Sequence, residues 1–500
     1  MPRRKAVLIA APDGWIAAIV ARPLVCCAMA EQQFVIGVDV GTQSAKVLIF
    51  AASGEVVAHG QHSLRPLEIP SPNRAIHPND DLWDGTVSAF RAAVAAFTAA
   101  GYDTAAIAAM GVCVIRCCRV LLRADGSLAH PVINWMDERL DHPHAHEQQY
   151  GEVSHITTSS GYVGLRLTGE RVDTCANLIG WWPIDDLTLD WSDDPERWET
   201  CRLSRDQVFD LVQPGEQIGG LIASVAAELG LPEGLPVIAT AHDKAVEALG
   251  SGVLDPGVGL VSLGTYIAAM ATGEAHIADA ESFWSFQAAI PGRYLYECWG
   301  VRRGMWSVSW FRDQFGAGAT EDELNSEAAG VSPGSDGLLT VHDWAAPPHA
   351  PFRKGAIVGF DGRHTRAHVY RSILEGIALR LKNHMDPMAD ELGQPFTGLV
   401  VSGGGANADV MMQILADVHG VPVSRNRLRS SAAIGCAVNA GMFAGVWSSS
   451  VEAADRLVQR DDTFEPIARN TERYARLAAL EAGLHEHLDP ITEAISALER

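Results

Sequence analysis

Four short stretches of the sequence carry side chains that could act on a phosphorylated ligand. In the first, an apolar run leads to Asp39, a turn at Gly41 and Thr42, and a second apolar run. This pattern predicts a β-hairpin whose tip carries an acid, hydroxyl groups and Lys46. Gly41 lets the backbone approach a bulky group, and nearby N–H groups can face an anion. Asp39 is placed to bind Mg²⁺ held by phosphates, although an ordinary hairpin with a polar tip fits the pattern equally well.

The second stretch places a carboxylate where a strand meets a helix. Residues 236–239 form a short apolar run typical of a buried strand, and His242, Asp243 and Lys244 follow it. A carboxylate at the C-terminal end of a strand, beside a helix N-terminus, is held ionised and faces a cleft. Asp243 could there accept a proton from a substrate hydroxyl as a general base. The alternative is that Asp243 only caps the helix.

The third and fourth stretches are glycine turns. Residues 262–265, Ser-Leu-Gly-Thr, predict a second hairpin tip whose N–H and hydroxyl groups suit phosphate oxygens. Residues 402–407, Ser-Gly-Gly-Gly-Ala-Asn, lie between a predicted strand and a predicted helix, where glycines admit a flat ring or phosphates. The run is neither GxGxxG nor GxxxxGK[ST], so it supports neither a dinucleotide site nor a P-loop. Taken alone, each glycine turn is more often only a turn.

Alternating strands and helices must position these stretches. Apolar periodicity predicts helices at 81–99, 218–229, 244–249, 367–385 and 409–419, and strands at 56–58, 107–114, 120–122, 258–262, 267–271 and 398–402. The strand–turn–strand pattern at 258–271 echoes that at 34–50, and residues 250–257 are the predicted interdomain linker. Residues 140–200 are expected to form an irregular rim or lid. The result is an α/β fold with two lobes and a cleft between them.

Composition and charge exclude several classes of protein. The chain has 500 residues, 47% of them hydrophobic, which suggests two or more domains with large cores. A net charge of −23 argues against binding to nucleic acid or to anionic membranes. Nine cysteines without a CxxC spacing support neither a zinc site nor a disulfide framework, and favour a reducing cytoplasm.

The N-terminal residues resemble a signal peptide only in part. Basic residues precede an apolar stretch, but Pro12, Asp13 and Arg22 interrupt it. We therefore expect residues 1–33 to be a disordered extension or an artefact of an upstream start. No other segment reaches the roughly 18 uninterrupted apolar residues of a membrane span.

In their order and spacing, these stretches resemble the FGGY family of carbohydrate kinases, in the actin-like superfamily that also holds hexokinases and glycerol kinase. The matching stretches are IGVDVGTQSAKVLIF, NWMDERL, LTGE, PVIATAHDKAVEALGSG, VSLGTYIAAM, LVVSGGGANADVMMQILADVHGVPV and AAIGCAVNAG, within about residues 34–460. The resemblance implies two actin-like (ribonuclease H-like) lobes with a catalytic cleft between them. The N-terminal lobe, 34–253, would hold the acceptor sugar and a phosphate loop. The C-terminal lobe, 254–445, would bind the nucleotide, and residues 446–500 would form peripheral helices.

The resemblance also implies an activity, namely ATP-dependent phosphorylation of a hydroxyl of a small, ketose- or pentulose-like sugar or a polyol. Asp243 would be the general base, and Asp39 and Asp243 would organise Mg²⁺. The expected contacts to ATP and its phosphates are Gly41, Thr42, Gln43, Ser44, Lys46, Gly264, Thr265, Gly404, Gly405 and Asn407.

The expected acceptor contacts are Arg116, Trp135, Asp137, Arg139, His242 and Asp243. Trp135 could stack on a sugar face, while Asp137 and Arg139 match the family's tryptophan–asparagine–aspartate loop. Arg116 stands where xylulose kinases carry a glutamine–methionine–histidine–glycine signature, which argues against xylulose. An arginine is found nearby in relatives such as the kinase of the autoinducer-2 sugar. It could suit a carboxylate, a hydrated ketone or a dense hydroxyl pattern, and the alternative is a surface salt bridge.

Three departures from the family pattern leave a second interpretation open. Between Tyr150 and Ser159 the chain lacks several tens of residues that relatives use as an acceptor-lobe wall. Gly161 and Ser430 also stand where acids are common in relatives. The alternative is thus a nucleotide-binding regulatory protein or pseudo-kinase of the same fold that has lost turnover. An actin-like chaperone ATPase is disfavoured, because residues 446–500 are too few for a peptide-binding domain. The acceptor could be a ketopentose, a tetritol or another polyol, and dimers are common among relatives.

Overall fold

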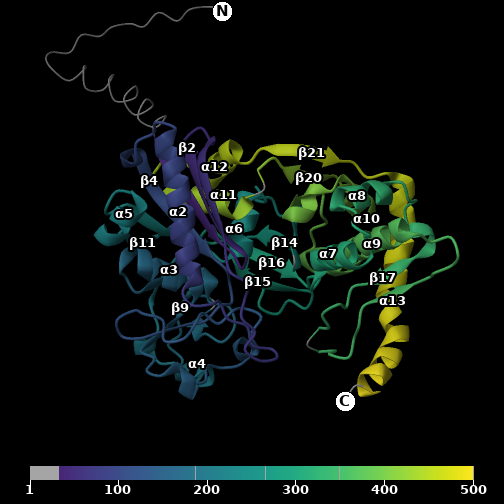
Figure 1. Ribbon diagram of the computed structural model, residues 1–500, viewed down its shortest axis with the longest axis horizontal. Helices are drawn as coiled ribbons and strands as arrows, with labels where there is room; N and C mark the ends of the chain where they lie inside the picture. Colours follow the sequence, from purple (N-terminus) through teal and green to yellow (C-terminus); the bar gives the residue numbers. More distant parts are fainter. Residues whose placement is uncertain (1–32, 186, 265, 348, 429, 499–500) are drawn as a thin grey trace, which may run out of the picture.

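The computed structural model describes residues 33–185, 187–264, 266–347, 349–428 and 430–498. Most strands join one of two large sheets, one built mainly from each half of the chain. In Figure 1 the first half of the chain lies on the left and most of the second half on the right. Four two-stranded pairs complete the strand pairing of the described residues.

The first sheet has six strands in the order β11-β12-β4-β1-β2-β3. Their bounds are β1 Phe34–Val40, β2 Ser44–Ala51, β3 Val56–Ser63, β4 Ile107–Val114, β11 Gln217–Gly220 and β12 Pro236–Ala239. Strand β1 pairs antiparallel with β2, as the predicted hairpin requires, and parallel with β4. The register places Asp39 opposite Lys46, so that both residues lie near the tip.

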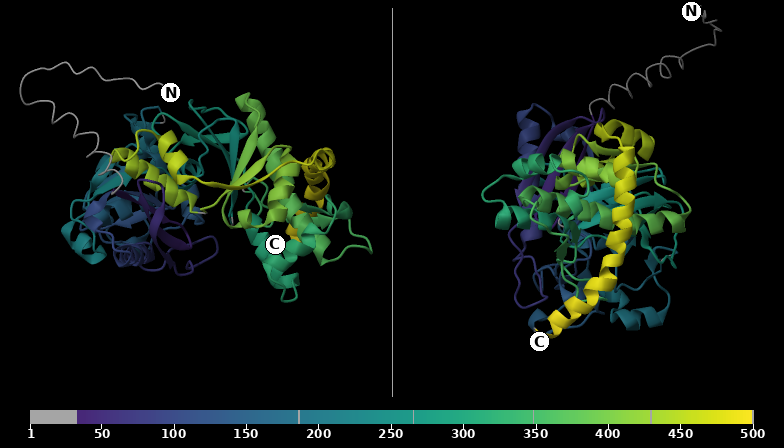
Figure 2. Two further views of the ribbon diagram at one scale, coloured as in Figure 1. Left: turned by 90° about the horizontal axis from the view of Figure 1, so that it is seen from above. Right: turned by 90° about the vertical axis from the view of Figure 1, so that its right-hand side faces the viewer.

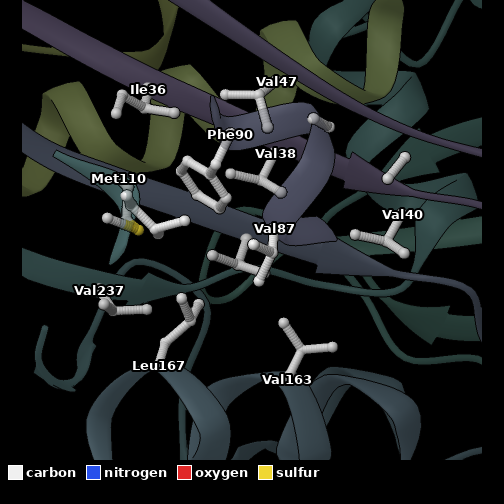
Figure 3. Close-up of a cluster of buried hydrophobic side chains, with 14 of the residues drawn as sticks. Ile36, Val38, Val40, Val47, Val87, Phe90, Met110, Val163, Leu167 and Val237 are labelled. Atoms are coloured by element: carbon white, nitrogen blue, oxygen red, sulfur yellow. The ribbon is translucent and has the colours of Figure 1, made fainter. Parts of the chain in front are cut away.

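Helix α2 (Asp81–Ala99) covers one face of this sheet because its apolar residues recur at the helical spacing. Figure 3 shows Val87 and Phe90 of this helix among β1 side chains such as Val38. Val163 and Leu167 of α3 (Ser159–Thr168) close the same cluster from another side. These residues are buried, so the sheet rests on a continuous apolar core.

The second sheet has seven strands in the order β15-β16-β14-β13-β19-β20-β21. Their bounds are β13 Val258–Leu263, β14 Ile267–Gly273, β15 Phe283–Gln287, β16 Tyr294–Cys298, β19 Gly398–Ser402, β20 Val423–Asn426 and β21 Arg460–Phe464. Strand β13 pairs antiparallel with β14 and parallel with β19. This repeats the relation of β1 to β2 and β4, which is the repeat expected from the sequence.

Helices α9 (Arg366–Leu392), α10 (Asp409–His419) and α13 (Ala468–Leu498) pack together in the second half. Figure 2 shows α13 running along the outer side of the molecule. Further helices are α4 Pro195–Cys201, α5 Ala223–Leu229, α7 Gly304–Phe315, α8 Glu321–Ala329 and α12 Ser450–Leu457. Further strands are β5 Val120–Leu122, β6 His155–Thr157, β7 Val172–Thr174, β8 Ile184–Asp185, β9 Asp190–Trp191, β10 Asp210–Val212, β17 Leu339–Val341 and β18 Ala356–Val358.

Two helices join the sheets. Helix α6 (Asp243–Gly250) packs against α11 (Ser431–Phe443), and α11 also covers β1 and β4, far from its neighbours in the sequence (Figure 1). The approach depends on glycines: a Cβ atom on Gly37 would lie 1.9 Å from the carbonyl oxygen of Ala433, and one on Gly250 would lie 1.7 Å from that of Ser431. A third apolar cluster contains residues of both sheets and both helices, so one core holds the two halves together.

Three predictions of secondary structure need correction. The helix expected at 218–229 begins only at Ala223, because residues 217–220 pair with β12 as an edge strand. The region 140–200 is less irregular than expected, since it contains α3, α4 and short strands. Residues 446–500 are not only peripheral helices, because β21 pairs with β20 and completes the second sheet.

Some predictions remain open. Residues 1–32 of the expected extension lie outside the described residues, as does Thr265. The domain boundaries at 253 and 445 stay a proposal, in which the loop between α6 and β13 is the linker. Among the described residues, none of the helices is both long and apolar enough to span a membrane.

Candidate active site

A cleft of about 1300 Å³ collects most of the predicted site residues. Its wall comes from the β1–β2 tip, the loop after β4, residues 135–141 and 179–182, the start of α6, and the second sheet. The predicted residues on this wall are Asp39, Gly41, Thr42, Gln43, Ser44, Lys46, Arg116, Trp135, Asp243 and Gly264. Segments that are far apart in the sequence therefore meet at one place, as the resemblance requires.

The hairpin tip presents Asp39 and Lys46 to the cleft. The Lys46 Nζ atom lies 4.0 Å from Asp39 Oδ2. Burial raises the pKa of Asp39 to about 6; Lys46 opposes this shift, whereas the nearby carboxylates of Asp243 and Glu247 add to it. The tip is also tied to the opposite wall, because Trp135 Nε1 donates to Thr42 Oγ1 at 3.2 Å. Lys46 is thus not enough to offset the burial of the Asp39 carboxylate.

Asp243 is the first residue of α6, and its side chain is one-third exposed to the cleft. One carboxylate oxygen, Oδ1, accepts from the Lys244 backbone N–H at 2.9 Å and lies 3.5 Å from Arg116 Nε. No hydrogen bond to Oδ2 occurs within the described part of the chain. His242, not Asp243, caps the helix, since its Nδ1 accepts from the Ala245 N–H at 3.4 Å. The carboxylate therefore remains available to a ligand.

Arg116 forms an ion pair across the cleft, from the loop after β4 to the second sheet. Its Nη1 and Nη2 donate to the two oxygens of Glu297 on β16, at 2.6 and 2.8 Å. Burial alone would lower the pKa of Arg116, but Glu297 and Asp243 outweigh it and hold that pKa well above its usual value. The alternative of a surface salt bridge is thus right about pairing but wrong about location, because the Arg116 side chain is only 16% exposed.

A second buried network lies beneath the cleft. Lys244 Nζ donates to Glu247 Oε2 and to Ser262 Oγ, both at 2.8 Å, and Ser402 Oγ donates to Glu247 Oε1. Burial alone would raise the pKa of Glu247, but Lys244 and the hydroxyl donors hold it below its usual value. Ser262 and Ser402 precede the two glycine turns of the second sheet, so Glu247 fixes both turns to the helix that carries Asp243.

Sequence reasoning missed Glu247 and Glu297. Each is an acid within an apolar run, Ala-Val-Glu-Ala-Leu in α6 and Tyr-Leu-Tyr-Glu-Cys in β16. Such a residue is costly to bury unless a partner neutralises it, and this was the signal that could have identified both.

Several predicted residues lie away from the cleft wall. Asp137 and Arg139 pair with each other at 2.7 Å, and Asp137 also accepts from the Ala75 N–H. His242 is fully buried against the Phe286 ring, and burial holds its pKa well below the usual value. These three side chains support the loops of the wall rather than forming its surface.

The third glycine turn also lies apart from the cleft wall. Gly404, Gly405 and Asn407 belong to a single helical turn that follows β19. Arg425 Nη1 donates to the carbonyl oxygen of Ala406 within this turn, at 3.0 Å. The turn is therefore held in place by β20, and its expected role in binding the nucleotide ring stays a prediction.

Carboxylates alone form no closed metal site here. Among the described residues there is no group of three or more His, Cys, Asp or Glu side chains that could hold a metal ion. Asp39 and Asp243 nevertheless face the same cleft, and the carboxylate of Asp243 contributes to the raised pKa of Asp39. Two carboxylates can bind Mg²⁺ when phosphate oxygens and water complete the coordination, as in many phosphoryl-transfer sites.

Comparison with known proteins gives consistent matches over nearly the whole chain. Residues 34–144 match the N-terminal domain, and residues 259–444 the C-terminal domain, of the FGGY family of carbohydrate kinases. The uncharacterized sugar kinase YgcE of Escherichia coli K12 is 39% identical over 93% of this chain and 95% of its own length. A glycerol kinase of Bordetella parapertussis is 29% identical over 90% of this chain and 96% of its own.

Solved structures agree on the fold. The structures of a ligand-bound xylulose kinase and of a gluconate kinase, both from Lactobacillus acidophilus, each match with a TM-score of 0.81. Each is 19% identical in sequence, and the match covers 91% of this chain and 98% of the other. The two-lobed actin-like architecture is thereby established.

Proposed function

The chain belongs to the FGGY family of carbohydrate kinases, and from this premise we propose that its cleft phosphorylates a small sugar or polyol with Asp243 as the general base. Members of this family transfer phosphate from ATP, so the reaction class follows from membership. The assignment of Asp243 as the general base is supported by the contacts of its two carboxylate oxygens. One of its oxygens is held by Lys244 and faces Arg116, while the other accepts no hydrogen bond from the described residues.

The assigned roles follow from these positions. Asp243 Oδ2 accepts the proton of the acceptor hydroxyl as that oxygen bonds to the γ-phosphorus and the bond from phosphorus to ADP breaks. Lys46, Gly264 and the 41–44 turn face the phosphates, where N–H groups and positive charge stabilise the transferring group. Because Arg116 and the Lys244 N–H fix Oδ1, the carboxylate need not reorient during the reaction.

Mg²⁺ fits the acids of the cleft. The raised pKa of Asp39 results from burial and from neighbouring carboxylates, and a divalent cation would relieve both effects. Asp39 and Asp243 would hold the ion together with phosphate oxygens. When bound, the ion would neutralise phosphate charge.

The acceptor is proposed to be a small polyol or ketose. Relatives named for glycerol and xylulose act on molecules of that size, and the cleft offers Arg116, Trp135 and aromatic side chains of the second sheet. Asp137, Arg139 and His242 are proposed to act indirectly, by holding the 135–141 loop and the start of α6.

The test is ATP turnover by the purified protein across pentuloses, hexuloses and polyols, with Asp243→Asn beside it. We expect one acceptor class to stimulate turnover, and the substitution to reduce kcat by about 10³-fold or more while ATP still binds. Asp279→Asn, an exposed aspartate outside the cleft, is the matched control and should leave kcat unchanged. ATP binding without acceptor-stimulated turnover in the unmodified protein would instead support the regulatory alternative.

A further inference from the structure

The two terminal nitrogens of the guanidinium at the acceptor end of the cleft are already paired with a carboxylate of the protein. Nη1 and Nη2 of Arg116 donate to Glu297, and Nε lies 3.5 Å from Asp243 Oδ1. A free guanidinium binds a carboxylate through two parallel hydrogen bonds, and here Glu297 already occupies that position. The carboxylate of the protein therefore stands where the carboxylate of a sugar acid would bind.

The surrounding charges oppose an anion as well. The Arg116 guanidinium faces two carboxylates, those of Asp243 and Glu297, so the formal charges of these three side chains sum to −1. Of the other cations of the wall, three are paired with acids, and Arg119 is held by carbonyl oxygens alone. Their partners are Glu247 for Lys244, Asp39 for Lys46, Asp81 for Arg65, and the carbonyl oxygens of Arg139 and His142 for Arg119. A second carboxylate brought next to these acids would meet like charge at short range.

The ion pair of Arg116 and Glu297 is buried. The Glu297 side chain is only 2% exposed, although the residue lines the cleft. A carboxylate in that position is costly unless a cation compensates it, and Arg116 supplies that cation from the opposite sheet. The guanidinium also lies 6.0 Å from the centroid of the Phe286 ring.

We infer that Glu297 determines the charge of the acceptor, and that this kinase phosphorylates uncharged polyols or ketoses and rejects the corresponding sugar acids. The inference rests on the proposed function and adds a specificity-determining residue to it. Overall similarity does not decide the matter, because a xylulose kinase and a gluconate kinase match this fold equally well. The inference about the charge of the acceptor depends instead on the pairing of Arg116 with Glu297.

The test compares kcat/KM for a polyol with that for the sugar acid of the same carbon number, using tetritol–tetronate and pentitol–pentonate pairs. For the unmodified protein we expect the polyol to be favoured by about 100-fold or more, because like charges at a desolvated site are strongly unfavourable. In Glu297→Gln, Arg116 loses its competing carboxylate, and the ratio should shift toward the acid by at least about tenfold. Glu274→Gln removes a charge from the same half of the chain at an 81% exposed position and should shift nothing.

Two further measurements keep the test decisive. Glu297→Asp keeps the charge and should keep the preference for the polyol, and thermal melting of each variant reports whether it is folded. The inference is overturned if the unmodified protein prefers the acid, if folded Glu297→Gln keeps the original ratio, or if Glu297→Asp loses the preference. In each of these cases the kinase activity itself stands. Failure of the unmodified protein to phosphorylate any acceptor would instead refute the proposed function.

Discussion

Removing the charge of Glu247 should destabilise the protein strongly, because that carboxylate compensates a buried ammonium group. The Lys244 and Glu247 side chains are 16% and 13% exposed, and their charged atoms are 2.8 Å apart. Removing one partner of a buried pair costs about 3–5 kcal/mol, since it leaves the other charge uncompensated. We expect Glu247→Met and Lys244→Met each to lower the free energy of unfolding by roughly that amount.

The double variant is the informative one. Replacing both partners with methionine removes both charges and leaves apolar side chains of similar length, so its loss should be well below the sum of the single losses. Urea unfolding of all four proteins gives the coupling energy, which we expect to be at least about 2 kcal/mol. Additive losses within about 0.5 kcal/mol would refute the reasoning, because they would mean that the two charges do not depend on each other.

The pH dependence of the same pair has a definite sign. The pKa of Glu247 is lowered in the folded protein, so its contribution is present above the unfolded-state pKa and is lost as the pH falls through the folded value. The pKa of Lys244 is raised, so its contribution is present below the unfolded-state value and is lost as the pH rises through the folded one. The coupling energy should therefore be largest near neutral pH and should fall in both acid and alkali.

Two other predictions concern the core and the hairpin tip. Gly37→Ala should lower the free energy of unfolding by about 3 kcal/mol or more, because the added carbon would lie 1.9 Å from the backbone oxygen of Ala433, which cannot move aside. The control is Gly483→Ala, whose added carbon meets nothing within 4 Å and which should be neutral or slightly stabilising in the same thermal melts. Burial raises the pKa of Asp39 to about 6, and the carboxyl group must be ionised to bind a cation. At limiting Mg²⁺, kcat/KM should therefore fall below pH 6 as this group takes up a proton. A pH profile that stays flat down to pH 5 would contradict a role of Asp39 in binding Mg²⁺.

The most accurate predictions from the sequence were of elements whose apolar pattern extends over the whole element. Strand β4 and helices α2 and α10 have the predicted ends, because an apolar run or a helical periodicity extends over the full length of each. Strand β21, with the sequence Arg-Asp-Asp-Thr-Phe, has no such pattern. It is an edge strand paired on one side only, and charged residues are common on such edges.

Some residues of the candidate site could also be predicted from local sequence, and others could not. The turns that carry Asp39, Asp243 and Gly264 could be found from local spacing, and the fold brings them to one cleft. The partner of Arg116 could not be found, because Glu297 lies 181 residues away and only the pairing of the two halves brings them together.

The resemblance leads us to expect an acid at position 161, and the packing around Gly161 explains why none is present. A side chain at Gly161 would collide with Thr157 Oγ1 and with the carboxylate of Asp173, which comes from β7. That carboxylate already accepts hydrogen bonds from Thr157, Thr158 and Ser160. Strand β7 therefore supplies an acid at this place, and there is no room for a second one on α3.

The glycine-mediated contact between α6 and α11 has a mechanical consequence. Backbone packed directly on backbone leaves no flexible side chains to absorb a displacement, so any rotation of one sheet against the other must turn about this contact. In a rotation, each atom travels in proportion to its distance from the axis. Val246 and Gly250, whose backbone lies at the contact, would travel least, and Asp243, within one turn of Val246, would travel little, while residues at the outer rim of the cleft would travel farthest. Such a rotation would widen the entrance for substrate exchange while Asp243, the proposed proton acceptor, moved little.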